Sequence, residues 1–359
     1  MYSECELLQP GQIIRPNADT KIAIELVNRL YGLKVKQITE LNAYDDKNFH
    51  VICEEYFRNN IFMTSGVQRD GYVLKITNSL DSRNTDYIEG QTEVLLFLNE
   101  KKMNAPCPVK NIQNLYYSLE MIGGNSNKHA VRLLTYKPGK MLMHSQVSDE
   151  LLENVGEFAA RLDKTLENFH HPAYDNHVSL WMLNCVPKLK DFVFAVKDTD
   201  RISMVNDIIS RFEVEVIKNI GKLETGIIHG DLNEQNILVN DDEKGIRAVL
   251  DVGDSHNSCY IFEIAITMCY MLLQTKDIAR GKPVLVGYQR VRQLPFLEKK
   301  ILKTCVCARI CQSLVLGAYS HMSDPENNYL LATQKPGWIL LEKLWPLDNE
   351  QLWKLTSRL

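Results

Sequence analysis

The chain has 359 residues, of which 45% are hydrophobic and 24% are charged, and its formal net charge is −4 at pH 7. This length suits two packed lobes or one large domain, and the composition is that of an ordinary globular protein. Because no long run of one charge sign occurs, we expect no nucleic-acid partner.

The opening segment lacks the apolar stretch of a secretory signal and the Arg-rich start of a transit peptide, so we expect a cytoplasmic protein. The most apolar segment, residues 260–273, is shorter than the roughly 20 residues that a membrane span requires. We therefore expect a buried helix there and no membrane partner. The nine cysteines are scattered, which favours reduced thiols. The cluster CVCARIC, residues 305–311, has no second Cys or His pair nearby, and we interpret it as small buried thiols rather than a metal site.

The first part of the chain has the pattern of a β-rich region. Residues 1–20 contain Pro10, Gly11 and Pro16 with little apolar periodicity, which predicts a flexible N-terminal arm. Helical spacing is then expected at 21–31 and 88–102. β-branched and aromatic residues predict five strands, with a hairpin between the second and the third: 35–43, 48–57, 71–77, 116–121 and 129–136.

The second part of the chain is predicted to be mainly helical, beginning after Pro138 and Gly139. Helices are expected at 148–167, 181–196, 202–220 and in the 260s, with two or three more before the C-terminus. Strands followed by helices indicate an α+β chain with a boundary near Pro138.

The candidate catalytic and metal-binding residues lie in one short section of strands and loops, GIIHGDLNEQNILVNDDEKGIRAVLDVG. Asp231 follows HisGly, Asn236 comes five residues later, and Asp251 ends a second apolar strand. A phosphoryl-transfer enzyme needs a carboxylate that accepts the hydroxyl proton and oxygen ligands for Mg²⁺. Asp231 fits the first role, and Asn236 and Asp251 fit the second. The alternative is a plain hairpin with Asp and Asn in its turns.

The pair HGDLNEQN and LDVGD resembles the catalytic and metal loops of the aminoglycoside phosphotransferase and choline kinase group. The resemblance implies a two-lobed protein-kinase-like fold. Its small β-rich lobe, residues 21–138, would bind the nucleotide, and its larger mainly helical lobe, residues 139–359, would hold the catalytic and substrate-binding residues.

The same resemblance implies a set of nucleotide contacts. In the family, a strand lysine contacts the phosphates and is held by a helix glutamate, which assigns these roles to Lys75 and Glu89, with Glu93 in reserve. No GxGxxG precedes Lys75, so Asn48 and nearby backbone N–H groups would cover the phosphates. The neighbouring Asp45 and Asp46 would repel phosphate, and we expect them to face the substrate or solvent.

The segment VRLLTYKPGKML, residues 131–142, resembles the hinge between the lobes. Backbone groups from Leu134 to Tyr136 would bond the purine there. Backbone contacts leave no side-chain signature, so this segment leaves ATP and GTP open.

Several further stretches, among them YDDKNFHV, RLDKTLENFHHP and LDVGDSHNSCYIFEIAITMCYML, resemble the hydroxylysine kinases of animals from about residue 20 onward. This resemblance implies transfer to the side-chain hydroxyl of 5-hydroxylysine, with GTP as donor and Mg²⁺ as cofactor. Asp254 is the candidate for the substrate ammonium group, with a turn or helix cap as its alternative. Glu263 would brace the catalytic loop, and His229 would orient it.

Two rival interpretations stay open. One is a kinase for another amino alcohol, such as choline, ethanolamine or homoserine. The other is a nucleotide-binding pseudokinase that acts as an interaction module. We interpret Trp338, Trp345 and Trp353 as packing anchors rather than a partner surface. The oligomeric state is not readable from the sequence.

Overall fold

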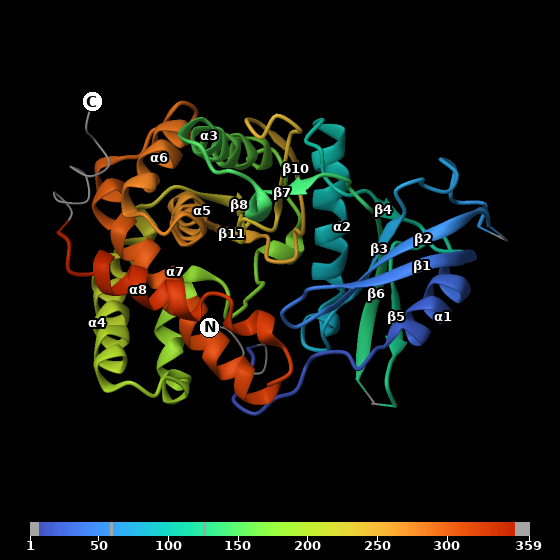
Figure 1. Cartoon of the computed structure of the whole chain (residues 1–359), viewed down its shortest axis with the longest axis horizontal. Coiled ribbons are helices and arrows are strands. Elements are labelled where there is room, and N and C mark those ends of the chain that lie inside the picture. The colour runs from blue at the N-terminus through green and yellow to red at the C-terminus, as the bar shows by residue number, and fades with distance from the viewer. Residues whose placement is uncertain (1–6, 58–59, 125–126, 349–359) are drawn as a thin grey trace. The chain divides into compact units, whose positions relative to one another are not determined.

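The computed structural model describes residues 7–57, 60–124 and 127–348, and the chain divides into two compact units (Figure 1). The N-terminal unit comprises residues 12–138 and 171–176, and the C-terminal unit comprises residues 1–11, 139–170 and 177–359. The first unit is built around an antiparallel sheet and the second mainly from helices, which confirms the predicted α+β class. Whether each predicted lobe works as a functional domain stays a prediction.

The sheet of the N-terminal unit has the strand order β1-β2-β3-β6-β4, and β5 also pairs with β6. All of its pairings are antiparallel, and the second and third strands form the predicted hairpin. Its strands are β1 (Leu33–Leu41), β2 (Lys47–Phe57), β3 (Tyr72–Ile76), β4 (Pro108–Val109), β5 (Ser118–Met121) and β6 (Lys128–Thr135). Each of the five predicted strands is confirmed within a few residues.

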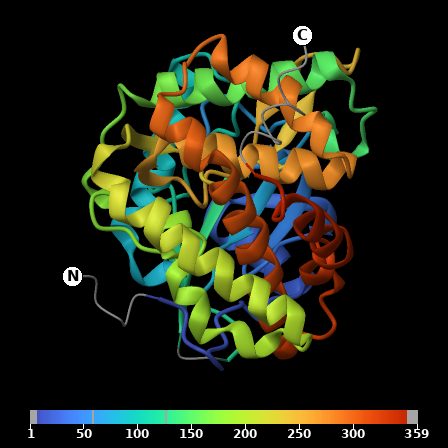
Figure 2. The ribbon, with the colours of Figure 1, turned by 90° about the vertical axis from the view of Figure 1, so that its left-hand side faces the viewer.

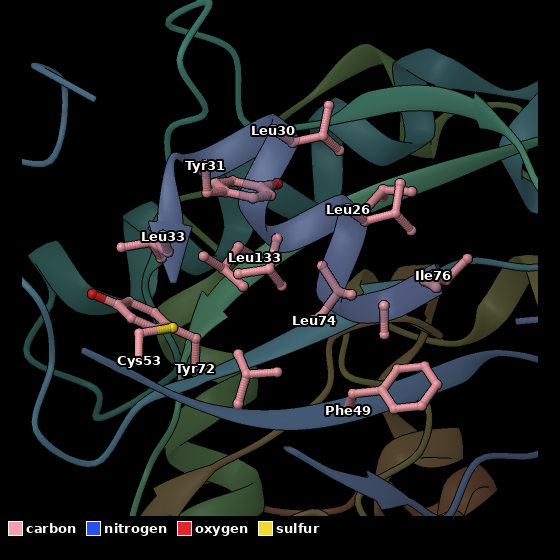
Figure 3. Close-up of a cluster of buried hydrophobic side chains, with 14 of the residues drawn as sticks. Leu26, Leu30, Tyr31, Leu33, Phe49, Cys53, Tyr72, Leu74, Ile76 and Leu133 are labelled. Carbon is pink, nitrogen blue, oxygen red and sulfur yellow. The ribbon is translucent and has the colours of Figure 1, made fainter. Parts of the chain in front are cut away.

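Helix α1 (Thr20–Tyr31) packs against this sheet through one apolar face (Figure 3). Leu26, Leu30 and Tyr31 meet Leu74 and Leu133 from the sheet in one buried cluster. The helix starts where Asp19 accepts from the backbone N–H of Ile22, and it ends at Gly32, whose positive φ a side chain would disfavour.

Helix α2 (Thr85–Glu100) starts three residues earlier than the pattern predicted. The side chain of Asn84 accepts from the backbone N–H of Tyr87 and so fixes the start of the helix. The short 3-10 helix η2 (Asp81–Arg83) lies just before this cap. Together they carry the chain from the end of β3 to the helix that contains Glu89.

The C-terminal unit contains two small antiparallel sheets. One has the order β10-β9-β7, and the other pairs β11 with β8. Their strands are β7 (Lys140–Met141), β8 (Thr225–Ile228), β9 (Ile237–Val239), β10 (Ile246–Val249) and β11 (His256–Cys259).

Helices supply the rest of this unit, and α4 lies beside α7 (Figure 2). The α-helices are α3 (Asp149–Leu166), α4 (Thr199–Glu215), α5 (Tyr260–Thr275), α6 (Gly281–Gln289), α7 (Phe296–Ser323) and α8 (Gln334–Leu344). The remaining turns of 3-10 helix are η3 (Leu142–His144), η4 (Pro172–Tyr174), η5 (Leu183–Asp191), η6 (Val193–Ala195), η7 (Ile217–Lys222), η8 (Ile278–Arg280) and η9 (Asn328–Leu331), of which η4 belongs to the N-terminal unit.

Two of the predicted helices differ from the structure. Residues 181–196 form the 3-10 helices η5 and η6 rather than one α-helix, because Pro187 lies inside the segment and supplies no backbone N–H. The helix predicted at 202–220 starts earlier, at Thr199, where Asp198 caps it. It ends at Glu215 and continues as the 3-10 helix η7.

Helices α3 and α6 touch through two glycines. A Cβ on Gly156 would lie 1.8 Å from the carbonyl oxygen of Val284, and a Cβ on Gly287 would lie 1.8 Å from that of Glu153. Both distances are far below van der Waals contact. These two positions therefore require glycine so that the helix backbones can meet.

The apolar helices of this unit are buried. The predicted buried helix of the 260s is confirmed as α5, and its residue Glu263 is fully buried. By length and composition α7 could cross a membrane, but 94% of its apolar window is buried inside the protein, as in a core helix. Cys305, Cys307 and Cys311 are buried on α7, as predicted.

Two tryptophans near the C-terminus pack against α4 of the same unit, Trp338 buried and Trp345 half-buried. Trp338 is buried on α8, and the guanidinium of Arg201 from α4 lies 4.8 Å from the centre of its ring. Trp345 donates to Asp207 at 2.8 Å. The prediction of packing anchors is confirmed for these two residues, and Trp353 lies outside the described residues.

Candidate active site

The predicted catalytic loop follows β8 and is held by a buried acid. Oε2 of Glu263 accepts from the backbone N–H groups of His229 and Gly230, the latter at 3.1 Å. Gly230 has a φ of 78°, and a Cβ there would lie 2.4 Å from the carbonyl oxygen of Asp254. The turn before Asp231 therefore needs glycine, and it depends on the carboxyl of Glu263 for two of its backbone bonds.

Three side chains hold the carboxylate of Asp231. Nη2 of Arg309 donates to Oδ1 at 2.8 Å, Nδ2 of Asn233 donates to Oδ2 at 2.7 Å, and Nδ2 of Asn236 donates to Oδ2 at 3.1 Å. The side chain of Asp231 is 19% exposed. It is thus fixed in direction while part of it stays open to an incoming group.

The pKa of Asp231 is raised to about 7, mainly by burial; the charge of Arg309 opposes this shift, and the nearby carboxylates of Asp251 and Glu234 add to it. A carboxyl with its pKa near neutrality can take and release a proton at physiological pH. Burial also raises the pKa of Glu263, to about 7. It lowers the pKa of His229 and so favours the neutral imidazole.

The two predicted metal ligands lie at the same end of the β9–β10 hairpin. The backbone N–H of Leu250 donates to the carbonyl oxygen of Asn236 at 2.8 Å, which brings the next residue, Asp251, beside Asn236. Asn236 also donates its Nδ2 to the backbone oxygen of Asp231 at 2.9 Å, so its Oδ1 is not used by these contacts. Oδ1 of Asn236 and the carboxylate of Asp251 form an all-oxygen donor set, which fits Mg²⁺.

Asp251 has a strained backbone. Its φ is 47°, in the left-handed region that non-glycine residues seldom adopt, and Oδ1 accepts from the N–H of Gly253 at 3.0 Å. Strain of this kind persists where the surrounding structure imposes it, and it gathers at functional sites.

The other two predicted residues of this unit, His229 and Asp254, lie in or against the turn before Asp231, because the backbone oxygen of Asp254 would be 2.4 Å from a Cβ on Gly230. The imidazole of His229 contacts the carbonyl oxygen of Leu250 at 2.8 Å, so it links the catalytic loop to β10. The backbone oxygen of Asp254 contacts Nδ1 of His256 at 2.7 Å. The role of the Asp254 carboxylate in substrate binding stays a prediction.

Sequence reasoning missed Asn233 and Arg309. Asn233 accepts from the N–H groups of Gln235 and Asn236 through Oδ1, which closes the loop around Asp231. Its place two residues after Asp231 was the available signal. Arg309 is the single charged residue of the apolar stretch 304–320, and a charge there is costly to bury unless it is paired, which was the signal in its case.

In the N-terminal unit, Lys75 lies near the end of β3 and pairs with Asp46. Nζ of Lys75 is 3.0 Å from Oδ2 of Asp46. Asp46 precedes β2 in the chain, and it was expected to face the substrate or solvent. The phosphate role of Lys75 stays a prediction.

The predicted partner of Lys75 has another contact here, and the predicted phosphate cover lies beside Lys75 in the sheet. Glu89 lies on α2 and accepts from the hydroxyl of Tyr117 at 3.2 Å. Asn48 lies opposite Lys75 in the β2–β3 register, and its Oδ1 is buried with no hydrogen-bond partner among the described residues. Both roles remain predictions.

The predicted hinge residues lie at the C-terminal end of β6. Leu134 pairs with Val73 of β3, and the N–H of Tyr136 donates to the carbonyl oxygen of Gly71 at 3.0 Å. The ring of Tyr136 stacks on that of His50, with 3.8 Å between the ring centres. The N–H of Tyr136 is therefore already used in the sheet, and the purine contact stays a prediction.

Comparison with known proteins gives consistent results. Residues 55–294 match the phosphotransferase enzyme family. The chain is 38% identical to a hydroxylysine kinase of Xenopus laevis, covering 95% of this chain and 93% of that protein. It is 34% identical to a hydroxylysine kinase of Bos taurus, covering 98% and 96%. Among solved structures, it resembles an amicoumacin kinase in complex with AMP-PNP and Ca²⁺, with a TM-score of 0.68, 18% identity, and coverage of 93% of this chain and 97% of that one.

Proposed function

We propose that this chain, which belongs to the phosphotransferase enzyme family and within it to the hydroxylysine kinases, transfers the γ-phosphate of GTP to the side-chain hydroxyl of 5-hydroxy-L-lysine. Membership of the family makes the chain a small-molecule kinase, a phosphotransferase that takes an alcohol group as its acceptor. The acceptor is supported by the names of the two relatives, and GTP is supported by the resemblance of the sequence to that family.

The observation that carries the proposal is the set of hydrogen bonds around Asp231. Donors from Arg309, Asn233 and Asn236 fix its carboxylate. In the proposed reaction Asp231 accepts the proton of the acceptor hydroxyl while that oxygen bonds to the γ-phosphorus. The bond from this phosphorus to the bridging oxygen breaks, and GDP leaves. The elevated pKa of Asp231 suits the transient uptake of this proton.

Oxygen atoms of Asn236 and Asp251 would hold Mg²⁺ beside the base. When bound, Mg²⁺ neutralises negative charge that develops on the phosphate oxygens. The hairpin bond between Leu250 and Asn236 keeps these two ligands together before any metal arrives. Replacing Asn236 with Ala should therefore raise the Mg²⁺ concentration for half-maximal rate by at least about tenfold.

The nucleotide would be bound by the N-terminal unit. We assign the phosphate contact to Lys75, with Glu89 as its predicted partner, the phosphate cover to Asn48, and the purine contact to the backbone at Leu134 and Tyr136. In the C-terminal unit, Asp254 would meet an ammonium group of the substrate, while Glu263 and His229 support the loop.

We place this reaction in the cytoplasm and in lysine degradation. The eight described cysteines are all free thiols, which is typical of a reducing compartment.

The test is nucleoside diphosphate release by the purified protein with Mg²⁺. GTP is compared with ATP, and 5-hydroxylysine with lysine, choline, ethanolamine and homoserine. Asp231→Asn should lower the acceptor-dependent rate by at least about a hundredfold and leave a measurable residual rate. Asp241→Asn, at a carboxylate whose side chain is 96% exposed, is the matched control and should keep the wild-type rate.

Each outcome discriminates between the candidate functions. Release that depends on hydroxylysine and is reduced to the residual rate in Asp231→Asn supports the assignment. A rate with choline, ethanolamine or homoserine instead would replace the acceptor. Stabilisation by Mg²⁺ and nucleotide with no turnover of any acceptor would favour a pseudokinase.

A further inference from the structure

Among the described Arg and Lys residues of the C-terminal unit, the most deeply buried is Arg309, in the middle of α7. The side chain of Arg309 is only 2% exposed. A buried charge is tolerated when hydrogen bonds and an opposite charge compensate for its lost hydration. Nη2 donates to Oδ1 of Asp231 at 2.8 Å and to the hydroxyl of Tyr270 at 3.1 Å, and Nη1 donates to the backbone oxygen of Trp181 at 2.9 Å.

The neighbours of Arg309 fix the orientation of its guanidinium group. Nη1 also donates to Oε1 of Gln312 at 2.9 Å, and Gln312 is held in turn by the carbonyl oxygens of Leu180, at 2.6 Å, and Met182, at 3.1 Å. The rings of Trp181 and Tyr270 lie 5.2 and 5.5 Å from the guanidinium carbon. Contacts from three segments, α5, α7 and residues 180–182, therefore leave the guanidinium little freedom.

The Asp231 carboxylate, which accepts from the Arg309 guanidinium, is hydrogen-bonded at both oxygens. Arg309 binds Oδ1, while Asn233 and Asn236, both in the catalytic loop, bind Oδ2. The two asparagines belong to the same loop as Asp231, whereas Arg309 belongs to the long buried helix α7. Of these three donors, Arg309 is the one that joins the Asp231 carboxylate to the helical core of the unit.

We propose that Arg309 is a positioning residue for the transfer reaction, because it holds the carboxylate of Asp231 in the orientation that receives the acceptor hydroxyl. This inference rests on the proposed function of Asp231. It also accounts for the motif CVCARIC, whose arginine lies between the buried Cys307 and Cys311.

A guanidinium on a base weakens that base, so the arrangement needs a physical reason. In phosphoryl transfer the attacking oxygen needs little deprotonation before the transition state, and most of the rate comes from positioning. A fixed orientation of the Asp231 carboxylate then contributes more to the transfer rate than a higher proton affinity would. Arg309 also places a positive charge near the carboxylates of Asp231 and Asp254.

The test compares Arg309→Met and Arg309→Lys with Lys303→Met. Lys303 is another buried cation on α7, but it donates to the backbone oxygens of Trp345 and Leu347. We expect Arg309→Met to lower kcat about 100-fold while KM for the nucleotide stays within about threefold, since only the orientation of Asp231 is lost. Arg309→Lys should recover part of kcat, and Lys303→Met should lower Tm while it keeps kcat.

A double-mutant cycle separates positioning from general stability. If Arg309 acts through Asp231, then Arg309→Met should cause no further loss of kcat in the Asp231→Asn background. If the two losses multiply, or if folded Arg309→Met keeps the wild-type kcat, the proposal is overturned. Should Arg309→Met fail to fold, Arg309→Lys and Arg309→Gln take its place in the same cycle.

The same four proteins give a readout that needs no acceptor. The effects of Arg309→Met and Asp231→Asn on the unfolding equilibrium constant should be non-additive by at least about fivefold. Additive effects would overturn the inference whatever the acceptor is. A wild-type protein that ignores hydroxylysine but shows this coupling would instead refute only the proposed acceptor.

Discussion

Nζ of Lys75 lies 3.0 Å from Oδ2 of Asp46, and the two side chains are only 9% and 16% exposed. The other carboxylate oxygen of Asp46 accepts from the backbone N–H of Asn78 at 2.8 Å and from its Nδ2 at 3.2 Å. The Asp46 carboxylate is therefore held in place by Asn78 independently of its contact with Lys75. Asn78 also donates to Asp81 at 2.7 Å, so one short polar network joins the start of β2 to η2 through the residue that follows β3 by two positions.

This network makes Asp46 a rival of Glu89 as the residue that orients Lys75. We expect Asp46→Asn to lower kcat/KM for the nucleotide by about tenfold, because a charge-assisted hydrogen bond in a buried site is worth about 1.5–3 kcal/mol. Steady-state kinetics with varied nucleotide measures this effect. Glu89→Gln is the matched comparison, and a larger loss in that variant would make Glu89 the partner.

The same network predicts a pH-dependent stability. Burial and the neighbouring Asp46 raise the pKa of Asp81 from 3.8 to about 6, so the folded state favours the protonated carboxyl. The stability that this protonation contributes is present below pH 3.8 and is lost as the pH rises through about 6. Asp81→Asn, which cannot ionise, should therefore be more stable than the wild type at pH 7.5, by on the order of 2 kcal/mol.

The measurement for Asp81 is thermal unfolding between pH 4.5 and pH 8. The difference in Tm between variant and wild type should grow with pH and level off above about pH 7. Asp70→Asn, at an exposed carboxylate, controls for the general change in net charge. Parallel Tm curves for Asp81→Asn and the wild type would contradict the elevated pKa.

Glu263 should be replaceable by Gln but not by Ala. Gln keeps an oxygen that can accept from His229 and Gly230, whereas Ala leaves two buried N–H groups without it. Each unsatisfied N–H costs about 1–3 kcal/mol. We expect Glu263→Ala to lose at least about 2 kcal/mol of unfolding free energy and most of its activity.

Denaturant unfolding and turnover of the two Glu263 variants decide this point together. Glu263→Gln is its own control, because it changes the charge and keeps the shape. Equal damage from both substitutions would show that the ionised carboxylate, rather than its hydrogen bonds, supports the loop.

The contact between α3 and α6 should not tolerate a single methyl group. Gly156→Ala would drive a Cβ to 1.8 Å from the carbonyl oxygen of Val284, so the helices must separate. We expect a loss of about 1–3 kcal/mol or more in unfolding free energy. Gly221→Ala is the control, because a Cβ there meets no atom within 4 Å. Similar stabilities for the two variants would mean that α6 shifts without cost.

Local chemistry made part of this structure predictable from the sequence. Alternation and β-branching located the strands of the N-terminal unit. The section with Asp231, Asn236 and Asp251 was predicted to consist of strands and loops, which the structure contains as β8, β9 and β10. The prediction of an α-helix at 181–196 was wrong, because the apolar spacing of this segment was given more weight than Pro187.

Long-range pairs were the part that the sequence could not supply. Arg309 meets Asp231 across 78 positions, and no spacing rule relates a helix arginine to a loop aspartate. Asp46 was misjudged for a similar reason. An acid near a presumed phosphate suggests repulsion, while the cation that neutralises it, Lys75, lies on the neighbouring strand.

The thiols of α7 offer a way to time the opening of the helix that carries Arg309. Burial raises the pKa of Cys305, Cys307 and Cys311, so these side chains stay protonated and shielded from alkylating reagents in the folded state. They can react only when the helix opens. The rate at which a maleimide modifies them therefore reports how often the support of Asp231 comes apart in the native protein.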